Sequence, residues 1–369
     1  MSISVCMIVK NEEKWLEQCL NSIKNLADEI IIVDTGSSDK TKEIAKKFTD
    51  KVFDYEWKND FSDARNFAIS KANSDWILSL DADESISSID FGKIKEITEN
   101  PEANAYHFIW RDYNNNVGIV GWKSSKEDIY PESKIANGYT EHYVLRLFQN
   151  SKGYEFEGKI HETLQNSIEK RYGKIFLTDI AIHHYGSLKN KDELLRKRDT
   201  YSKMLKERLI SKEYREKEGY YILFELAKEL AMKKELEEAK RVLEKSISLN
   251  PNFSKSLAML GTIKIIEKDF YNAEKLLKEA VVLEPNDSDI HSNLGVVYSE
   301  QGNFMKAIRK FERAIELNPK SADNFFNLGV VYLRIKKREK ARYFFEKAIE
   351  LNPSYRGKIG SLDMSYSFK

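Results

Sequence analysis

A spacing of 34 residues recurs in the C-terminal part of the 369-residue chain and limits its fold more than any other feature. A unit that repeats at a fixed period of this length cannot bury its apolar face alone, so neighbouring units must stack. The period therefore predicts a solenoid, in which each proline marks the turn between units. The recurring positions are Pro251, Pro285, Pro319 and Pro353, and Ala239, Ala273, Ala307 and Ala341.

Small and aromatic residues recur inside these units, and the pattern resembles the tetratricopeptide repeat. Leu294, Gly295 and Tyr298 recur as Leu328, Gly329 and Tyr332. We expect four all-helical repeats over residues 220–355, the first degenerate, because Ala227 and Leu230 replace its Gly and Tyr. Only 16 residues follow Pro353, too few for a convincing capping helix, and residues 356–369 are expected to be a C-terminal tail. We therefore expect the repeats to bind a peptide or protein, or to form a homodimer through an exposed last helix.

The first half of the chain alternates buried β-type runs with amphipathic helical stretches. This alternation predicts an α/β, Rossmann-like domain over residues 1–188, with a mostly parallel sheet and helices on both faces. A charged helical linker is expected over residues 189–219. Ligands of such sheets bind at the carboxyl ends of the strands. The predicted strands are residues 3–9, 29–34, 51–53 and 76–80.

The fourth predicted strand runs directly into three carboxylates, Asp81, Asp83 and Glu84. Carboxylate oxygens suit Mg²⁺ or Mn²⁺, so an Asp-x-Asp pair at a strand end is a candidate metal seat. The alternative is an acidic turn or a helix cap. Asn11 and Asp34 follow two other strands, and the parallel order brings them to the same edge of the sheet.

Four segments together resemble the inverting family-two glycosyltransferases of GT-A fold, and most of all the subgroup of sublancin-type peptide S-glycosyltransferases. The resemblance covers about the first 190 residues. It implies a nucleotide-sugar donor, by family default a UDP-sugar, and a divalent metal, Mn²⁺ or Mg²⁺. The segments are SVCMIVKNEEKWLEQCLNSI, DEIIIVDTGSSDKT, YEWKNDFSDARNFAI and DWILSLDADE.

The resemblance also implies roles for individual residues. Asp83 would bind the metal with His184, or with His183 as the alternate. Asp34 could instead cap a turn, and Arg65 could form a surface salt bridge. The residues expected to bind the nucleotide-sugar are Val9, Lys10, Asn11, Glu12, Asp34, Arg65, Asn66, Asp81 and Arg146.

An inverting transferase needs a general base beside the acceptor nucleophile. Glu162 is our first choice and His161 the second; alternatively His161 contacts the metal or a phosphate and Glu162 only positions it. Residues 111–142 are polar and lack a clear period, so we expect an irregular lid at the acceptor entrance. Trp122 and Tyr130 would contact the acceptor there.

The composition excludes several other classes. The net charge of +1 gives no sign of a nucleic-acid partner. Cys6 and Cys19 are expected to be reduced core residues. With neither a signal peptide nor an apolar run that could span a bilayer, we expect a cytoplasmic enzyme. Its acceptor would be a peptide or protein. The alternatives are a glycan or lipid precursor of the cell envelope, or a catalytically dead repeat scaffold.

Overall fold

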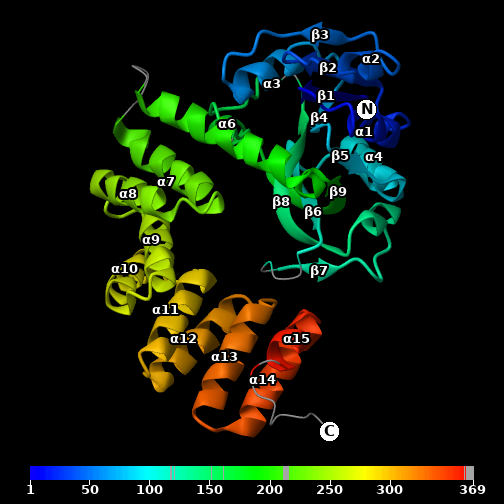
Figure 1. Cartoon of the computed structure of the whole chain (residues 1–369). Helices are drawn as coiled ribbons and strands as arrows, with labels where there is room; N and C mark the ends of the chain where they lie inside the picture. The colour runs from blue at the N-terminus through cyan, green and yellow to red at the C-terminus, as the bar shows by residue number, and fades with distance from the viewer. Residues whose placement is uncertain are drawn as a thin grey trace. The chain divides into compact units, whose positions relative to one another are not determined.

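The structure is a computed structural model of the whole chain, and it describes residues 1–116, 119, 121–150, 152–160, 162–210, 216–360 and 362 (Figure 1). His161, the second candidate base, lies outside these residues. The chain divides into two compact units. One unit consists of Met1–Asn116 and Ser124–Asn190, and the helices from Lys191 onward belong to the other.

The first unit begins with the predicted alternation of strands and helices. Its first elements are β1 (Ile3–Val9), α1 (Leu16–Ile23), β2 (Glu29–Asp34), α2 (Thr41–Ala45), β3 (Val52–Asp54), α3 (Phe61–Ile69) and β4 (Trp76–Ser79). The later elements are β5 (Glu84–Ile86), η1 (Ser88–Asp90), α4 (Phe91–Glu99), β6 (Ala105–Asn114), β7 (Lys123–Ser124), η2 (Pro131–Ile135), β8 (Gly138–Gln149), α5 (Gln165–Lys170), β9 (Ile175–His184) and η3 (Gly186–Leu188).

The strands form one sheet in the order β3-β2-β1-β4-β8-β6-β9-β5, with β7 paired to β8. The pairs β2–β3, β1–β2 and β1–β4 are parallel, which confirms the parallel order predicted for the first four strands. Beyond β4 the sheet is mixed. β8 runs antiparallel to β4 and β6, whereas β6 and β9 are parallel. The antiparallel pairs arise because β6 and β8 form a long hairpin-like ladder without a crossover helix between them.

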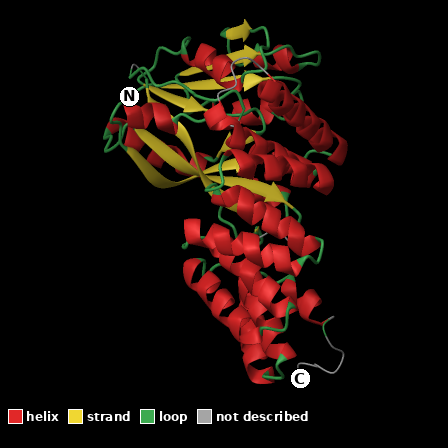
Figure 2. Ribbon diagram, turned by 90° about the vertical axis from the view of Figure 1, so that its left-hand side faces the viewer, coloured by secondary structure: helices red, strands yellow, loops and turns green. Residues whose placement is uncertain are grey.

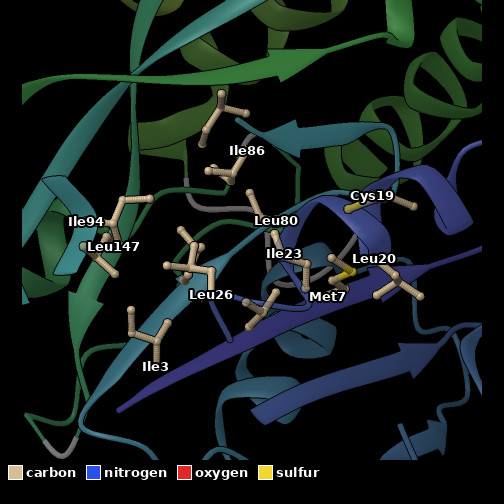
Figure 3. Packing of buried hydrophobic residues seen from close by; sticks show 14 of the residues in the cluster. Ile3, Met7, Cys19, Leu20, Ile23, Leu26, Leu80, Ile86, Ile94 and Leu147 are labelled. Carbon is tan, nitrogen blue, oxygen red and sulfur yellow. The ribbon is translucent and has the colours of Figure 1, made fainter. Parts of the chain in front are cut away.

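Helices cover both faces of the parallel half, as predicted. Ile3 and Met7 of β1 lie on one face and pack against Cys19, Leu20 and Ile23 of α1 (Figure 3). The alternate residues of β1, Cys6 and Ile8, lie on the other face with Ala68 of α3 and Ile168 of α5. Because alternate residues of β1 face two different apolar cores, nearly every position of this strand is apolar. Cys6 and Cys19 are both free and buried, as expected.

The expected lid is more ordered and more buried than its polarity suggested. β6 continues to Asn114 and β8 begins at Gly138, so much of residues 111–142 belongs to the sheet. Trp122 and Tyr130 are only 7% and 4% exposed. The Tyr130 hydroxyl donates to Asp90 Oδ2 at 3.0 Å. Their burial does not support the predicted acceptor contacts, and we correct both to packing residues.

From Lys191 onward, the elements of the second unit within the described residues are all helices (Figure 2). Paired helices follow the 34-residue period from α7 to α14, and α6 packs against α7. None of the helices in the described ranges is both long and apolar enough to span a membrane. The helices are α6 (Lys191–Ile210), α7 (Glu216–Met232), α8 (Leu236–Leu249), α9 (Ser254–Ile266), α10 (Phe270–Leu283), α11 (Ser288–Glu300), α12 (Phe304–Leu317), α13 (Ala322–Arg334), α14 (Arg338–Leu351) and α15 (Tyr355–Gly360).

The short helix α15 was not expected from the sequence. It packs against α14, and its Tyr355 and Ile359 are 1% and 4% exposed within the core of the repeats. Two apolar side chains placed one turn apart are enough to cover α14, although the helix has only six residues. Our expectation that the tail could not supply a capping helix was therefore wrong.

The repeated glycines are explained by the close approach of paired helices. A Cβ added at Gly295 of α11 would lie 2.7 Å from the Phe311 ring of α12. Gly261 and Gly329 meet Leu277 and Phe345 in the same way. A larger side chain at these positions would therefore force the two helices apart.

We predict that Gly295→Ala destabilises the repeat unit by about 1 kcal/mol, because overpacking outweighs the better helix propensity of alanine. Thermal unfolding followed by circular dichroism at 222 nm checks this. Gly357→Ala is the matched control, since a Cβ at Gly357 of α15 meets nothing within 4 Å. Equal melting temperatures for the two variants would contradict the packing argument.

Candidate functional site

The loops after β1 and β2 are joined at the carboxyl edge of the sheet. The last pair of the β1–β2 ladder is Val9 and Asp34, so both loops start at the same level. Asn11 has a φ of 54° and accepts a hydrogen bond from the Ser38 amide through Oδ1 at 2.8 Å. The backbone N–H group of Asn11 donates to Ser37 Oγ at 2.9 Å. These bonds fix the two loops together and leave Lys10 exposed beside them.

Asp34 is a buried carboxylate with one unsatisfied oxygen. Its Oδ2 accepts hydrogen bonds from the amides of Gly36 and Ser37, at 3.1 and 2.9 Å. Its Oδ1 is buried and has no hydrogen-bond partner within the described structure. A buried polar atom without a partner costs free energy, so it marks a place where a ligand can donate a hydrogen bond.

A cluster of buried charges lies behind the turn that follows β4. Arg65 of α3 pairs with Asp81 Oδ1 through Nη2 at 2.6 Å and with Glu162 Oε1 through Nε at 2.7 Å. Arg146 of β8 pairs with Asp81 Oδ2 at 3.0 Å and with Glu84 Oε1 at 2.5 Å. Asp81 is thus held between two guanidinium groups. We name Arg65, Asp81, Glu84, Arg146 and Glu162 the ion cluster.

Glu84 fixes the shape of the turn. Its Oε2 accepts from the Asp81 amide at 2.9 Å, and its Oε1 accepts from Trp110 Nε1 at 2.6 Å. Burial raises the pKa of Glu84 and nearby Asp81 adds to that rise, whereas Arg146 opposes it. Because its oxygens are committed to protein donors, Glu84 shapes the site rather than extending into it.

Asp83 and His184 meet where β4 and β9 end. His184 Nε2 lies 3.7 Å from Asp83 Oδ2, and its Nδ1 lies 2.8 Å from Asp112 Oδ1. The β6–β9 register places Asp112 beside His184, and Trp110 stacks on the imidazole at 4.1 Å. Burial alone would lower the pKa of His184, but the bond to Asp112 and the charge of Asp83 raise it.

The charge and ligand chemistry of this pair suit a cation. A Cβ at Gly186 would collide with the imidazole of His184 and lie 2.9 Å from Asp83 Oδ2, so only glycine fits at this position, where the backbone approaches both side chains closely. A protein cation already lies at Asp83, since Lys189 Nζ is 2.9 Å from the same oxygen. No group of three or more His, Cys, Asp or Glu ligands occurs within the described ranges. A metal here would take Asp83 and His184 and complete its shell with substrate oxygens, as Mg²⁺ commonly does.

Two predicted site residues are engaged elsewhere. Asn66 uses both ends of its amide on the backbone of Phe156, at 2.8 and 3.0 Å. His183 lies next to His184 on β9 and so points to the opposite face. There it stacks on Tyr113, whose hydroxyl lies 2.7 Å from Nδ1. The structure thus brings together Asp83 and His184 but not His183.

The sequence analysis missed Lys189, Trp110 and Asp112. Trp110 and Asp112 lie on β6, which pairs with β8 and β9 rather than with the first four strands. Lys189 follows η3, and its Nζ also lies 2.7 Å from Glu12 Oε1. In the sequence, Lys189 is the first residue of the expected charged linker, and the residues around it form no motif that distinguishes it from other lysines.

Comparison with known families agrees with this geometry. Residues 4–175 match the family described as Glycosyl transferase family 2. Residues 220–253 and 286–354 match models described as Tetratricopeptide repeat. The chain therefore combines a domain of glycosyl transferase family 2 with C-terminal tetratricopeptide repeats.

Several proteins are similar to this chain over part of their length. A TPR repeat-containing protein of Synechococcus elongatus is 35% identical over 166 residues, which are 45% of this chain and 36% of that protein. The SPbeta prophage-derived glycosyltransferase SunS of Bacillus subtilis is 31% identical over 255 residues, 69% of this chain and 55% of SunS. An uncharacterized glycosyltransferase of Rickettsia typhi is 30% identical over 206 residues, 54% of this chain and 65% of that protein. The chain thus spans between about a third and two thirds of the lengths of these relatives.

Among solved structures, the crystal structure of MamA covers 46% of this chain and 98% of its own, with 22% identity and a TM-score of 0.38.

We predict that Arg146→Met lowers the stability of the chain by about 3–5 kcal/mol, because it leaves Glu84 buried without its main cationic partner. Urea unfolding measures the loss. The double variant Arg146→Met/Glu84→Gln should recover a large part of it, since the uncompensated charge is removed as well. If the two variants are equally unstable, lost packing rather than charge explains the effect.

We predict that His183 makes the free energy of unfolding depend on pH, because its pKa is lowered to about 3 by burial and by the charge of Arg111. As pH falls below about 6.5, the unfolded chain binds a proton that the folded chain cannot bind, so stability falls. The loss should reach about 2–3 kcal/mol at pH 4.5. Urea unfolding of wild type and His183→Gln between pH 7.5 and 4.5 tests this, and parallel pH profiles would contradict it.

Proposed function

We propose that this protein transfers a sugar, with inversion, from a nucleotide-sugar to a peptide or protein acceptor. The donor is a UDP-sugar, and a divalent metal assists. The single observation that carries the proposal is the meeting of Asp83, His184 and Gly186 at the carboxyl end of β4, within a family-two domain. This is the edge at which α/β sheets bind their ligands.

The nucleoside half of the donor is assigned to the loops after β1 and β2. Asp34 offers its unpartnered Oδ1 to a ribose hydroxyl or a base N–H group. Asn11 holds the neighbouring loop in place through Ser38, and Lys10 lies exposed at the rim. Val9 and Glu12 are assigned to the same side of the donor site. A nucleoside bound there would extend its phosphates toward β4, the neighbour of β1.

Asp83 and His184 are assigned to the metal, Mn²⁺ or Mg²⁺. When bound, such a cation would neutralise the negative charge of the departing diphosphate. Asp112 holds the His184 imidazole so that Nε2 faces Asp83, which is the usual arrangement of a ligand histidine and a supporting carboxylate. Arg65 and Arg146 are both paired with Asp81, so we assign them to holding Asp81 in place beside the donor site.

Glu162 remains our first candidate for the general base. Its carboxylate lies against Arg65 and is therefore held at the edge of the ion cluster, near the end of β4. A carboxylate in this place can accept the proton of the acceptor as the new bond forms. Arg65 would then act as the group that positions Glu162.

The repeats are assigned to the acceptor. Tetratricopeptide stacks present a concave face to other polypeptides, which favours a peptide or protein over a glycan or lipid precursor. The main reason for expecting a homodimer was an uncovered last helix, and α15 removes that reason because its apolar side chains are buried on α14. Acceptor binding is therefore the role that we propose for the repeats.

Asp83→Asn tests the enzymatic proposal. We predict that it lowers the Mn²⁺-dependent release of UDP from a panel of UDP-sugars by at least about a hundredfold. Without the carboxylate that holds the metal, the charge of the departing diphosphate would no longer be neutralised. Asp179→Asn is the matched control; Asp179 lies on β9, is 75% exposed and pairs with Lys93. Its activity should equal that of wild type. Background release in wild type and Asp83→Asn alike would favour the dead scaffold.

A further inference from the structure

Lys189 bridges two carboxylates that follow neighbouring strands. Its Nζ lies 2.7 and 3.0 Å from the two oxygens of Glu12, which follows β1. The same nitrogen lies 2.9 Å from Asp83 Oδ2, at the end of β4. The side chain of Lys189 is only 14% exposed. β1 and β4 are adjacent parallel strands, so Lys189 crosses the carboxyl edge at the centre of the candidate donor site.

The ammonium of Lys189 and the proposed metal need the same atom. Asp83 Oδ2 is the oxygen that faces both His184 and Gly186. A monovalent and a divalent cation in contact with one carboxylate oxygen repel each other, so binding of the metal must displace Lys189 from Asp83. Glu12 holds the same ammonium through both of its oxygens, which keeps it within the site after that displacement.

We propose that Lys189 is a catalytic residue with two partners in turn: it neutralises Asp83 before the donor arrives, and it binds the diphosphate once the metal has taken Asp83. This inference rests on the proposed function. A lysine ammonium suits a diphosphate because it is a compact charge with three donors on a flexible stem. Lys189 then adds a positive charge on the side of the diphosphate that faces Glu12.

A purely structural salt bridge makes a different prediction from this exchange. If Lys189 only tied the β1 and β4 loops together, its removal would disorder the site and weaken both metal and diphosphate binding. If Lys189 competes with the metal and then assists the diphosphate, its removal must strengthen metal binding and weaken diphosphate binding. The two affinities therefore separate the two roles.

The test measures binding to the full chain by isothermal titration calorimetry, first of Mn²⁺ alone and then of UDP or inorganic pyrophosphate at saturating Mn²⁺. For Lys189→Met we expect Mn²⁺ to bind about tenfold more tightly and both diphosphates about tenfold more weakly. Lys189→Arg should behave like wild type toward the diphosphates, because it keeps the charge. Lys170→Met is the control; Lys170 pairs with Glu157, both are exposed, and neither affinity should change.

Two results would overturn the inference. Unchanged affinities, or a parallel loss of both affinities in a Lys189→Met chain that melts like wild type, would remove the exchange and leave the proposed function standing. No Mn²⁺-dependent binding of either diphosphate to wild type would overturn both proposals. If Lys189→Met does not fold, Lys189→Gln replaces it, with the same opposite changes expected.

Discussion

The ion cluster behind β4 is the interaction on which the geometry of the candidate site depends. Asp81 pairs with Arg65 and Arg146, and Arg146 also pairs with Glu84. Each buried ion costs several kcal/mol in lost hydration, and this cost is repaid only while its partners stay in place. The four side chains come from α3, the end of β4, β5 and β8, so a shift of any of these elements would unpair a buried charge. The turn that carries Asp83 is therefore held both by Glu84 and by partners on other elements of the domain.

The parallel half of the fold and the carboxylates at its edge could be predicted because they follow from local patterns. Continuous apolar runs identified β1, β2 and β4, and each strand end placed its polar residue at one edge. Asp34 and Asp83 were found in this way, and the structure places both at that edge. The 34-residue period was equally informative, since Gly295 and Phe311 recur because paired helices touch there.

The remaining features depend on pairings that no local pattern encodes. Arg146 was singled out only through the family resemblance, and its two carboxylate partners become visible with the antiparallel β4–β8 register. Asp112 meets His184 because β6 and β9 are neighbours in the sheet although they are distant in the sequence. Lys189 was hidden in a run of charged residues, and only its approach to Asp83 sets it apart. Such residues come from the mixed half of the sheet or from segments after it, where sequence order does not predict spatial order.

The charges around Asp83 explain why the donor and a metal would bind together. Asp83, Glu12 and Asp112 are compensated by one ammonium, Lys189, and by the imidazole of His184, whose pKa is raised, against the opposing effect of burial, by Asp112 and Asp83. A diphosphate entering alone would add negative charge to a site that already holds three carboxylates. A divalent cation entering alone would meet the ammonium on Asp83. Both electrostatic repulsions would be smaller if the two ligands bound together. The phosphate oxygens would attract the displaced ammonium of Lys189, and the divalent cation would bind the carboxylate of Asp83. In the proposed exchange, one lysine would therefore couple the binding of the two ligands.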